Sequence, residues 1–107
     1  MLFFRKIMDA KSALNAVSDE LRPTDCANIQ ELTYYYVFSA GVVSGAVQPE
    51  TSHESGYTGT WSPEGSPTSS GNDVVKHTSL AGVTNVRRVR ISTVLAGGTV
   101  TVWAMGR

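Results

Sequence analysis

The feature that most constrains the fold is the pattern of residues 85–107. Residues 86–94 and 99–105 are both rich in β-branched side chains with period-two alternation, and a Gly-Gly pair at 97–98 stands between them. Two such runs joined by a Gly-Gly turn are typical of a β-hairpin. The sequence therefore predicts that these two strands pair with each other and that the fold is mainly β.

The first of these strands carries the most concentrated charge in the chain. Arg88 and Arg90 share one face because strand side chains alternate, and Arg87 points to the other face. Val89 and Ile91 lie on the Arg87 side, so that side is expected to face the core. Arg88 and Arg90 can then pair with carboxylates on a neighbouring strand, or they can make ion pairs with another subunit.

The returning strand places its largest side chains away from the core. Val100 and Val102 are expected to face inward, so Trp103 and Met105 face outward. An outward Trp beside a Met is typical of a protein contact, and a domain that covers both faces of this strand would show the same pattern. Trp103 and Met105, with the two arginines, are our candidate contact residues here.

The rest of the chain continues the β pattern. Further strands are expected at residues 29–38, 42–48 and 73–80, with a short one at 57–61 and a polar loop at 62–72. About six strands, with turn signals roughly every eight to twelve residues, are typical of a β-sandwich or a small jelly roll. We therefore expect residues 29–107 to form a single antiparallel β-sandwich, or jelly-roll-like, domain.

Residues 1–28 differ from the rest and are expected to form an N-terminal helix or arm. Apolar side chains recur at three- and four-residue spacing, at Ile7, Ala10, Leu14, Val17 and Leu21. This is the spacing of one helical face, which can pack on the β-domain or reach a neighbouring subunit. Phe3 and Phe4 favour the neighbour, because chain ends fray unless something covers them. The candidate contacts of this segment are Phe3, Phe4 and Ile7.

Composition argues against several kinds of partner. Nine Lys and Arg residues balance nine Asp and Glu residues, so the neutral chain has little attraction for nucleic acid. No apolar run approaches the ~18 residues that a membrane span requires. The single cysteine, Cys26, cannot form an intrachain disulfide. It is expected to be a structural thiol or a loop residue in a protein made in a reducing cytosol.

No residues have the spacing of a catalytic or metal-binding motif. The sequence contains no nucleophile elbow, phosphate-binding glycine loop or zinc cluster, and its two histidines are expected to be solvated or half exposed. Glu50 and Glu54 would need a rigid support to act as a catalytic pair, and they are expected on a loop. We therefore expect no enzyme activity, no cofactor and no metal, and a function carried by surfaces.

Three segments together carry a resemblance to a known family. They are the lead-in at 8–14, the passage at 36–41, 45–52 and 57–61, and the end at 86–91 and 98–102. These segments resemble the small β-sandwich proteins that decorate, or cement, the capsids of tailed bacteriophages. In such proteins a strand, an acidic-polar loop and a Gly-Thr-Trp passage precede an Arg-rich terminal hairpin.

The resemblance implies a structural virion protein that binds the outside of a phage capsid and stabilises it by bridging capsid subunits. It implies self-association as a homotrimer and contact with the major capsid protein. The protein would lie on the capsid surface of the virion after assembly in the host cytoplasm. Direct binding to nucleic acid or to a membrane is not expected.

Two other functions fit the same sequence. A carbohydrate- or host-surface-binding module would use the loop at 50–72, with Tyr57 and Trp61 as stacking platforms. Burial of Trp61 against the β-domain is the simpler expectation for that residue. A phage neck or tail subunit would differ from a decoration protein mainly in oligomer symmetry.

Overall fold

The computed structural model describes residues 3–22, 30–70, 75–81 and 85–107, and this part of the chain is mainly β, as predicted. The strands are β1 (Phe3–Lys11), β2 (Glu31–Phe38), β3 (Ser44–Ser52), β4 (Ser62–Pro63), β5 (Thr68–Ser69), β6 (Val75–Ala81), β7 (Val86–Ala96) and β8 (Val100–Gly106). None of the described residues forms a helix that is long and apolar enough to cross a membrane. Cys26 lies outside the described residues.

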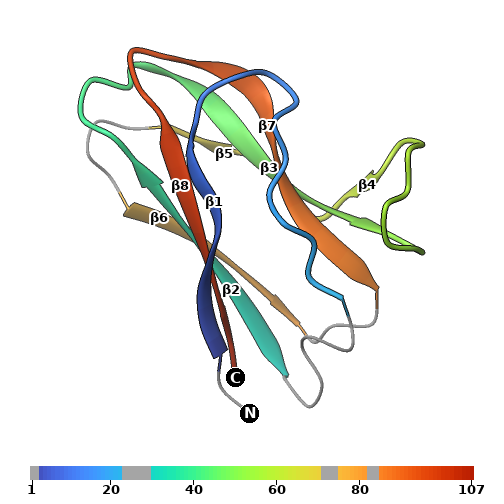
Figure 1. Cartoon of the computed structure of the whole chain (residues 1–107). Coiled ribbons are helices and arrows are strands. Elements are labelled where there is room, and N and C mark those ends of the chain that lie inside the picture. Colours follow the sequence, from blue (N-terminus) through green and yellow to red (C-terminus); the bar gives the residue numbers. More distant parts are fainter. Residues whose placement is uncertain (1–2, 23–29, 71–74, 82–84) are drawn as a thin grey trace.

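The strands form two antiparallel sheets (Figure 1). Sheet A has the order β1-β8-β2-β6, so that the strands nearest the two ends of the chain lie side by side. In its register Phe3 lies opposite Gly106 and Tyr35 lies opposite both Trp103 and His77. Aromatic and β-branched side chains favour these strands because they pack well on a pleated surface.

In sheet B, β3 pairs with β7 along one edge and with the two short strands β4 and β5 along the other edge. The N-terminal segment at 12–21 then runs along β7 (Figure 1). Ser18 N donates to Val89 O at 2.8 Å, and Leu21 and Arg87 exchange two backbone hydrogen bonds of 2.7 and 2.9 Å. This segment therefore serves as an irregular edge strand of sheet B.

The predicted terminal hairpin is wrong, although both of its strands exist. β7 pairs with β3 in sheet B, and β8 pairs with β1 and β2 in sheet A. The Gly-Gly turn instead carries the chain from one sheet to the other. Gly97 has a φ of 89°, and a Cβ there would overlap the carbonyl oxygen of Gly41 on a neighbouring turn. The prediction of a turn at Gly97 and Gly98 is confirmed, but this turn connects strands of two different sheets and not two paired strands of one sheet.

Of the two forms predicted for the N-terminal segment, a helix or an arm, the helix is wrong for its described residues. β1 pairs with β8, and a register shift between Lys6 and Met8 marks a bulge. The bulge turns two successive side chains inward, so Ile7 and Met8 are 3% and 4% exposed. Leu14, by contrast, is 54% exposed, so the apolar stripe that suggested a helix does not form one face. The ladder hydrogen bonds offered by β8 and β7 favour extended backbone here.

The core lies between the two sheets and contains side chains from both. Tyr34, Tyr36 and Val102 come from sheet A, and Val89 and Ile91 come from sheet B. The inward facing of Val89, Ile91, Val100 and Val102 confirms the alternation predicted for β7 and β8. The predicted short strand at 57–61 is not formed, since the pairing with β3 begins only at Ser62.

Candidate functional site

The outer face of sheet A carries several large apolar side chains. Phe4 on β1 stacks on Trp103 on β8, with ring centroids 4.9 Å apart and planes 6° from parallel. Met105 lies opposite Phe4 in the β1–β8 register. Phe4 is 59% exposed, and Trp103 and Met105 are half-buried. The structure thus brings together three of the predicted contact residues from opposite ends of the chain.

This face continues across β2 and β6. Tyr35 lies 6.2 Å from His77, measured between ring centroids, and Val37 pairs with Val75 in the ladder. Val75 is 59% exposed. We call this surface the aromatic face; its residues are Phe4, Tyr35, Val37, Val75, His77, Trp103 and Met105. Polar side chains also lie on this face, and Lys6 Nζ is 5.5 Å from the centroid of the Trp103 ring. The face nevertheless carries more aromatic and apolar side chains than the solvated face of an antiparallel sheet normally does.

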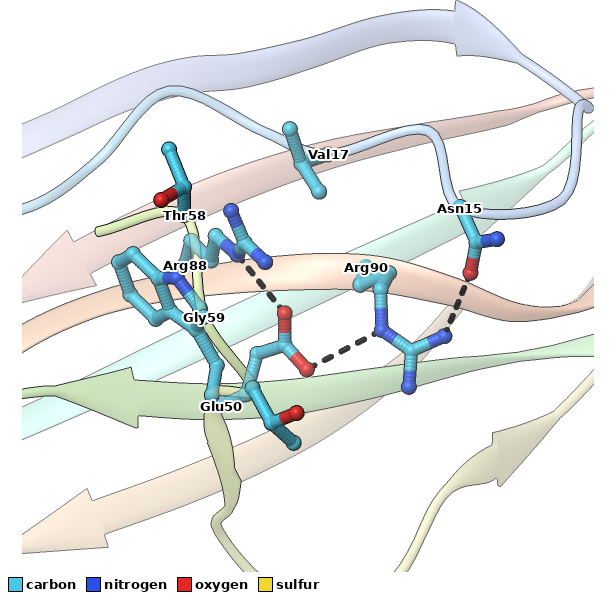
Figure 2. Close-up of a pocket in the computed structure, with 9 residues that line it drawn as sticks. Asn15, Val17, Glu50, Thr58, Gly59, Arg88 and Arg90 are labelled. Carbon is cyan, nitrogen blue, oxygen red and sulfur yellow. Dashed lines mark hydrogen bonds and ion pairs between the residues drawn. The ribbon is translucent and has the colours of Figure 1, made fainter. Parts of the chain in front are cut away.

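The outer face of sheet B carries the predicted arginines, paired with a carboxylate (Figure 2). Glu50 lies opposite Arg88 in the β3–β7 ladder. The Nε atoms of Arg88 and Arg90 donate to the two carboxylate oxygens of Glu50, at 2.7 and 3.1 Å. Glu50 is only 3% exposed. Of the two expectations for these arginines, the structure therefore supports pairing with a carboxylate across the strand.

Two further contacts hold this cluster. The ring of Trp61 lies 4.0 Å from the guanidinium carbon of Arg88, and its indole N–H donates to Tyr57 O at 2.8 Å. Arg90 Nη1 donates to Asn15 Oδ1 at 3.0 Å (Figure 2). Trp61 is buried, as the sequence suggested. Each arginine is thus held at two points, which reduces its freedom to change rotamer.

A surface depression of about 560 Å³ lies over this cluster. It is lined by Asn15, Val17, Glu50, Thr58, Gly59, Thr60, Trp61, Arg88 and Arg90. We call it the arginine depression. Its walls come from the N-terminal segment, from β3 and β7, and from the connection between β3 and β4, so it exists only once the chain is folded.

Arg87 is the charged residue on the predicted core face of β7, and it has a specific partner. Its Nε lies 3.0 and 3.2 Å from the two carboxylate oxygens of Glu64. The side chains of Arg87 and Glu64 are 8% and 17% exposed. A buried guanidinium is tolerated when a carboxylate neutralises it, so the position can face inward.

The predicted contact residues are therefore divided among three places. Phe4, Trp103 and Met105 share the aromatic face, whereas Arg88 and Arg90 lie on the outer face of the other sheet. Phe3 is half-buried and packs against the core. Ile7 was expected to touch another subunit, but the bulge in β1 places it inside the core, where it has no surface to offer.

Glu50 is the site residue whose role the sequence did not reveal. The sequence predicts a strand that ends at residue 48, which places Glu50 on a loop. The strand instead continues to Ser52, with Pro49 opposite Val89. The alternation of Gln48, Glu50 and Ser52 on one face was the available signal. Among the described residues, no group of three or more His, Cys, Asp or Glu side chains is placed to hold a metal ion.

Comparison of the chain with protein-family models, curated proteins and solved structures found no match. Its function is therefore argued from the two outer faces.

Proposed function

We propose that this protein is a structural subunit that binds other protein subunits through the aromatic face, as a decoration protein on the outside of a phage capsid. The observation that carries the proposal is the Phe4–Trp103 stack on an exposed sheet surface. Monomeric soluble proteins rarely expose a large contiguous apolar patch, and such patches mark interaction sites. Aromatic side chains supply much of the binding energy at protein interfaces.

The strand pairing supports a β-sandwich of the jelly-roll type. If the segment at 12–21 is counted as the second strand, the first strand pairs with the last and the second with the next to last. β2 pairs with β6, and β3 pairs with the short strands β4 and β5. This nested order is that of one long hairpin rolled onto itself. Jelly rolls build many viral capsid and lectin domains, which is an analogy of fold rather than of site.

The resemblance of the chain to phage cement proteins supplies the specific partner. In this proposal the protein forms a homotrimer, contacts the major capsid protein and lies on the capsid surface after assembly in the host cytoplasm. Three copies of the aromatic face would engage one shell at once, so weak single contacts would add up to firm binding. The function needs no enzyme activity, cofactor, nucleic acid or membrane.

The proposal is tested by co-sedimentation with capsid shells that lack the chain, together with the native mass of the free protein. Phe4→Ser and Trp103→Ser are the test variants, and Val43→Ser is the matched control, since Val43 is 75% exposed outside the aromatic face. Loss of a central aromatic contact costs about 2 kcal/mol or more, or roughly 30-fold in affinity. Wild-type binding by both test variants would remove the aromatic face from the proposal.

Native mass separates the other structural assignment. A trimer agrees with a decoration protein, whereas a larger closed ring would favour a neck or tail subunit. Shell binding with no trimer would leave decoration in place but would contradict the predicted symmetry.

The carbohydrate-binding alternative gains no support from the two rings proposed as stacking platforms. Trp61 is 4% exposed and one face of its ring is covered by Arg88. Tyr57 packs edge-on against His53, with centroids 4.8 Å apart. A sugar would need an open ring face to stack on.

A further inference from the structure

The arginine depression lies on the opposite sheet from the aromatic face and has no role in the proposed contact with a shell. We propose that it binds a sugar that bears a carboxylate, of the uronic acid class, with the terminal nitrogens of Arg88 and Arg90 holding the carboxylate. This site is independent of the proposed function. It uses charge and hydrogen bonds, in place of ring stacking, to recognise its ligand.

The two arginines of the depression keep hydrogen-bond donors for a ligand. Glu50 takes only the Nε–H of each arginine, and Asn15 takes Nη1 of Arg90. Within the described parts of the chain, the two terminal nitrogens of Arg88 and Nη2 of Arg90 have no hydrogen-bond partner. The arginine side chains are 17% and 30% exposed, and both line the depression. A guanidinium presents such donors in a planar fork that matches a carboxylate.

The charges of the arginine depression do not balance. Glu50 contributes one negative charge and the arginines contribute two positive charges, so the cluster retains one positive charge (Figure 2). A single anion would balance it. Both oxygens of Glu50 already accept a hydrogen bond from an arginine, which directs its charge away from the remaining donors.

Both arginine side chains are already held in place before a ligand binds. Arg88 is held between the Trp61 ring and the Glu50 carboxylate, and Arg90 is held between Glu50 and Asn15. Binding would therefore immobilise little that is not already fixed. A preorganised site avoids much of the entropic cost of ordering long side chains.

The size and the lining of the depression suit a ligand larger than a carboxylate. A volume of about 560 Å³ is within the range of small-molecule sites and is much more than one carboxylate needs. The remaining walls offer polar groups from Asn15, Thr58 and Thr60. A ligand that carries several hydroxyls beside its carboxylate would use both features. These observations favour an acidic sugar over the single acidic side chain of a protein partner.

The experiment is a titration of the full-length chain followed by ¹H–¹⁵N NMR, with glucuronate as the probe. The indole N–H of Trp61 should shift, and that of Trp103, on the other sheet, should not. Glucose lacks the carboxylate and acetate lacks the hydroxyls, so each should bind at least about tenfold more weakly than glucuronate, because a charged hydrogen bond is lost or the polar wall is unused.

Variants identify the residues. Arg90→Gln should weaken glucuronate binding about tenfold or more, and Arg107→Gln should not change it, since Arg107 pairs with Glu31 at the end of the inner strands of sheet A. Asn15→Gly is a second test variant that keeps the left-handed backbone, whose φ is 67°. It removes one support of Arg90 and should weaken binding without unfolding the protein, which the dispersion of the NMR spectrum reports.

Three results would overturn the inference. The first is an unmoved Trp61 signal at saturating excess of glucuronate. The second is an equal response to acetate, which would reduce the site to a simple anion site. The third is tighter binding of a short acidic peptide than of glucuronate, which would make the depression a protein contact. Trp103→Ser, which alters the aromatic face, should retain glucuronate binding. Loss of the sugar site and loss of the shell contact are therefore measured separately.

Discussion

Replacing Glu50 by Gln should destabilise the fold by about 2–4 kcal/mol. The carboxylate is buried and accepts from two guanidinium groups, at 2.7 and 3.1 Å. A hydrogen bond to a charged group contributes about 1.5–3 kcal/mol. Gln keeps the size and one acceptor oxygen, so one such bond is lost and the other is weakened, while two cations lose their counter-charge. Partial exposure of Arg88 and Arg90 keeps the loss below that of a fully buried pair.

The assay is thermal and urea unfolding of the wild type and the variant at neutral pH. A domain of this size loses roughly 4 °C in melting temperature per kcal/mol, so Glu50→Gln should melt roughly 8–16 °C lower. Glu31→Gln is the matched control, because Glu31 also pairs with an arginine, Arg107, but the two side chains are 40% and 63% exposed. An exposed pair contributes less than about 1 kcal/mol.

Equal melting temperatures for the two variants would refute the reasoning, since Glu50 is buried and pairs with two arginines, whereas Glu31 is more exposed and pairs with one. Urea unfolding adds a second check, because the midpoint should fall with an unchanged slope. A changed slope would mean that Glu50→Gln alters the compactness of one state and not the strength of the ion pairs.

Three further outcomes are expected. Gly97→Ala should cost about 2 kcal/mol or more in a urea titration, because its φ is 89° and the new Cβ would overlap Gly41 O; an effect under about 0.5 kcal/mol would contradict this. Ala10→Gly should stabilise the fold by about 0.5–1 kcal/mol, since Ala10 has a φ of 47°, and a lower urea midpoint would show that the backbone there is not strained. Burial raises the pKa of Tyr36 above its ordinary value near 10. The unfolded chain therefore releases that proton first, so stability should hold up to about pH 10 and then fall by at most about 1.4 kcal/mol per pH unit. The variant Tyr36→Phe should lack this part of the fall in unfolding free energy above pH 10.

The alternation within β7 and β8 could be predicted from the sequence, but their pairing could not. Period two fixes which side chains share a face, and the burial of Val100 and Val102 follows from it. A Gly-Gly turn specifies a tight reversal and says nothing about whether the chain stays in one sheet. That choice depends on which strands occupy the neighbouring edges, and those strands are far away in the sequence.

The N-terminal segment shows a second limit of prediction from sequence patterns. Its apolar spacing matched a helix, yet a bulge at Ile7 and a change of sheet near Ser12 explain the same residues as extended chain. The arginines show a third limit of prediction from sequence. Arg88 and Arg90 were correctly placed on one face, but their partner Glu50 lies across a non-local ladder. A register of this kind is set by tertiary packing, which local patterns do not contain.

The pairing of β1 with β8 also affects when the chain can fold during its synthesis. Phe3 lies opposite Gly106, and Leu21 lies opposite Arg87. A ribosome must therefore make nearly all of these residues before Phe3 can meet its ladder partner. Contacts of such long range make folding slow and leave early strands exposed meanwhile. Until β8 is made, the nascent segment at 3–21 would leave Phe3 and Phe4 uncovered, which makes the incomplete chain prone to aggregation.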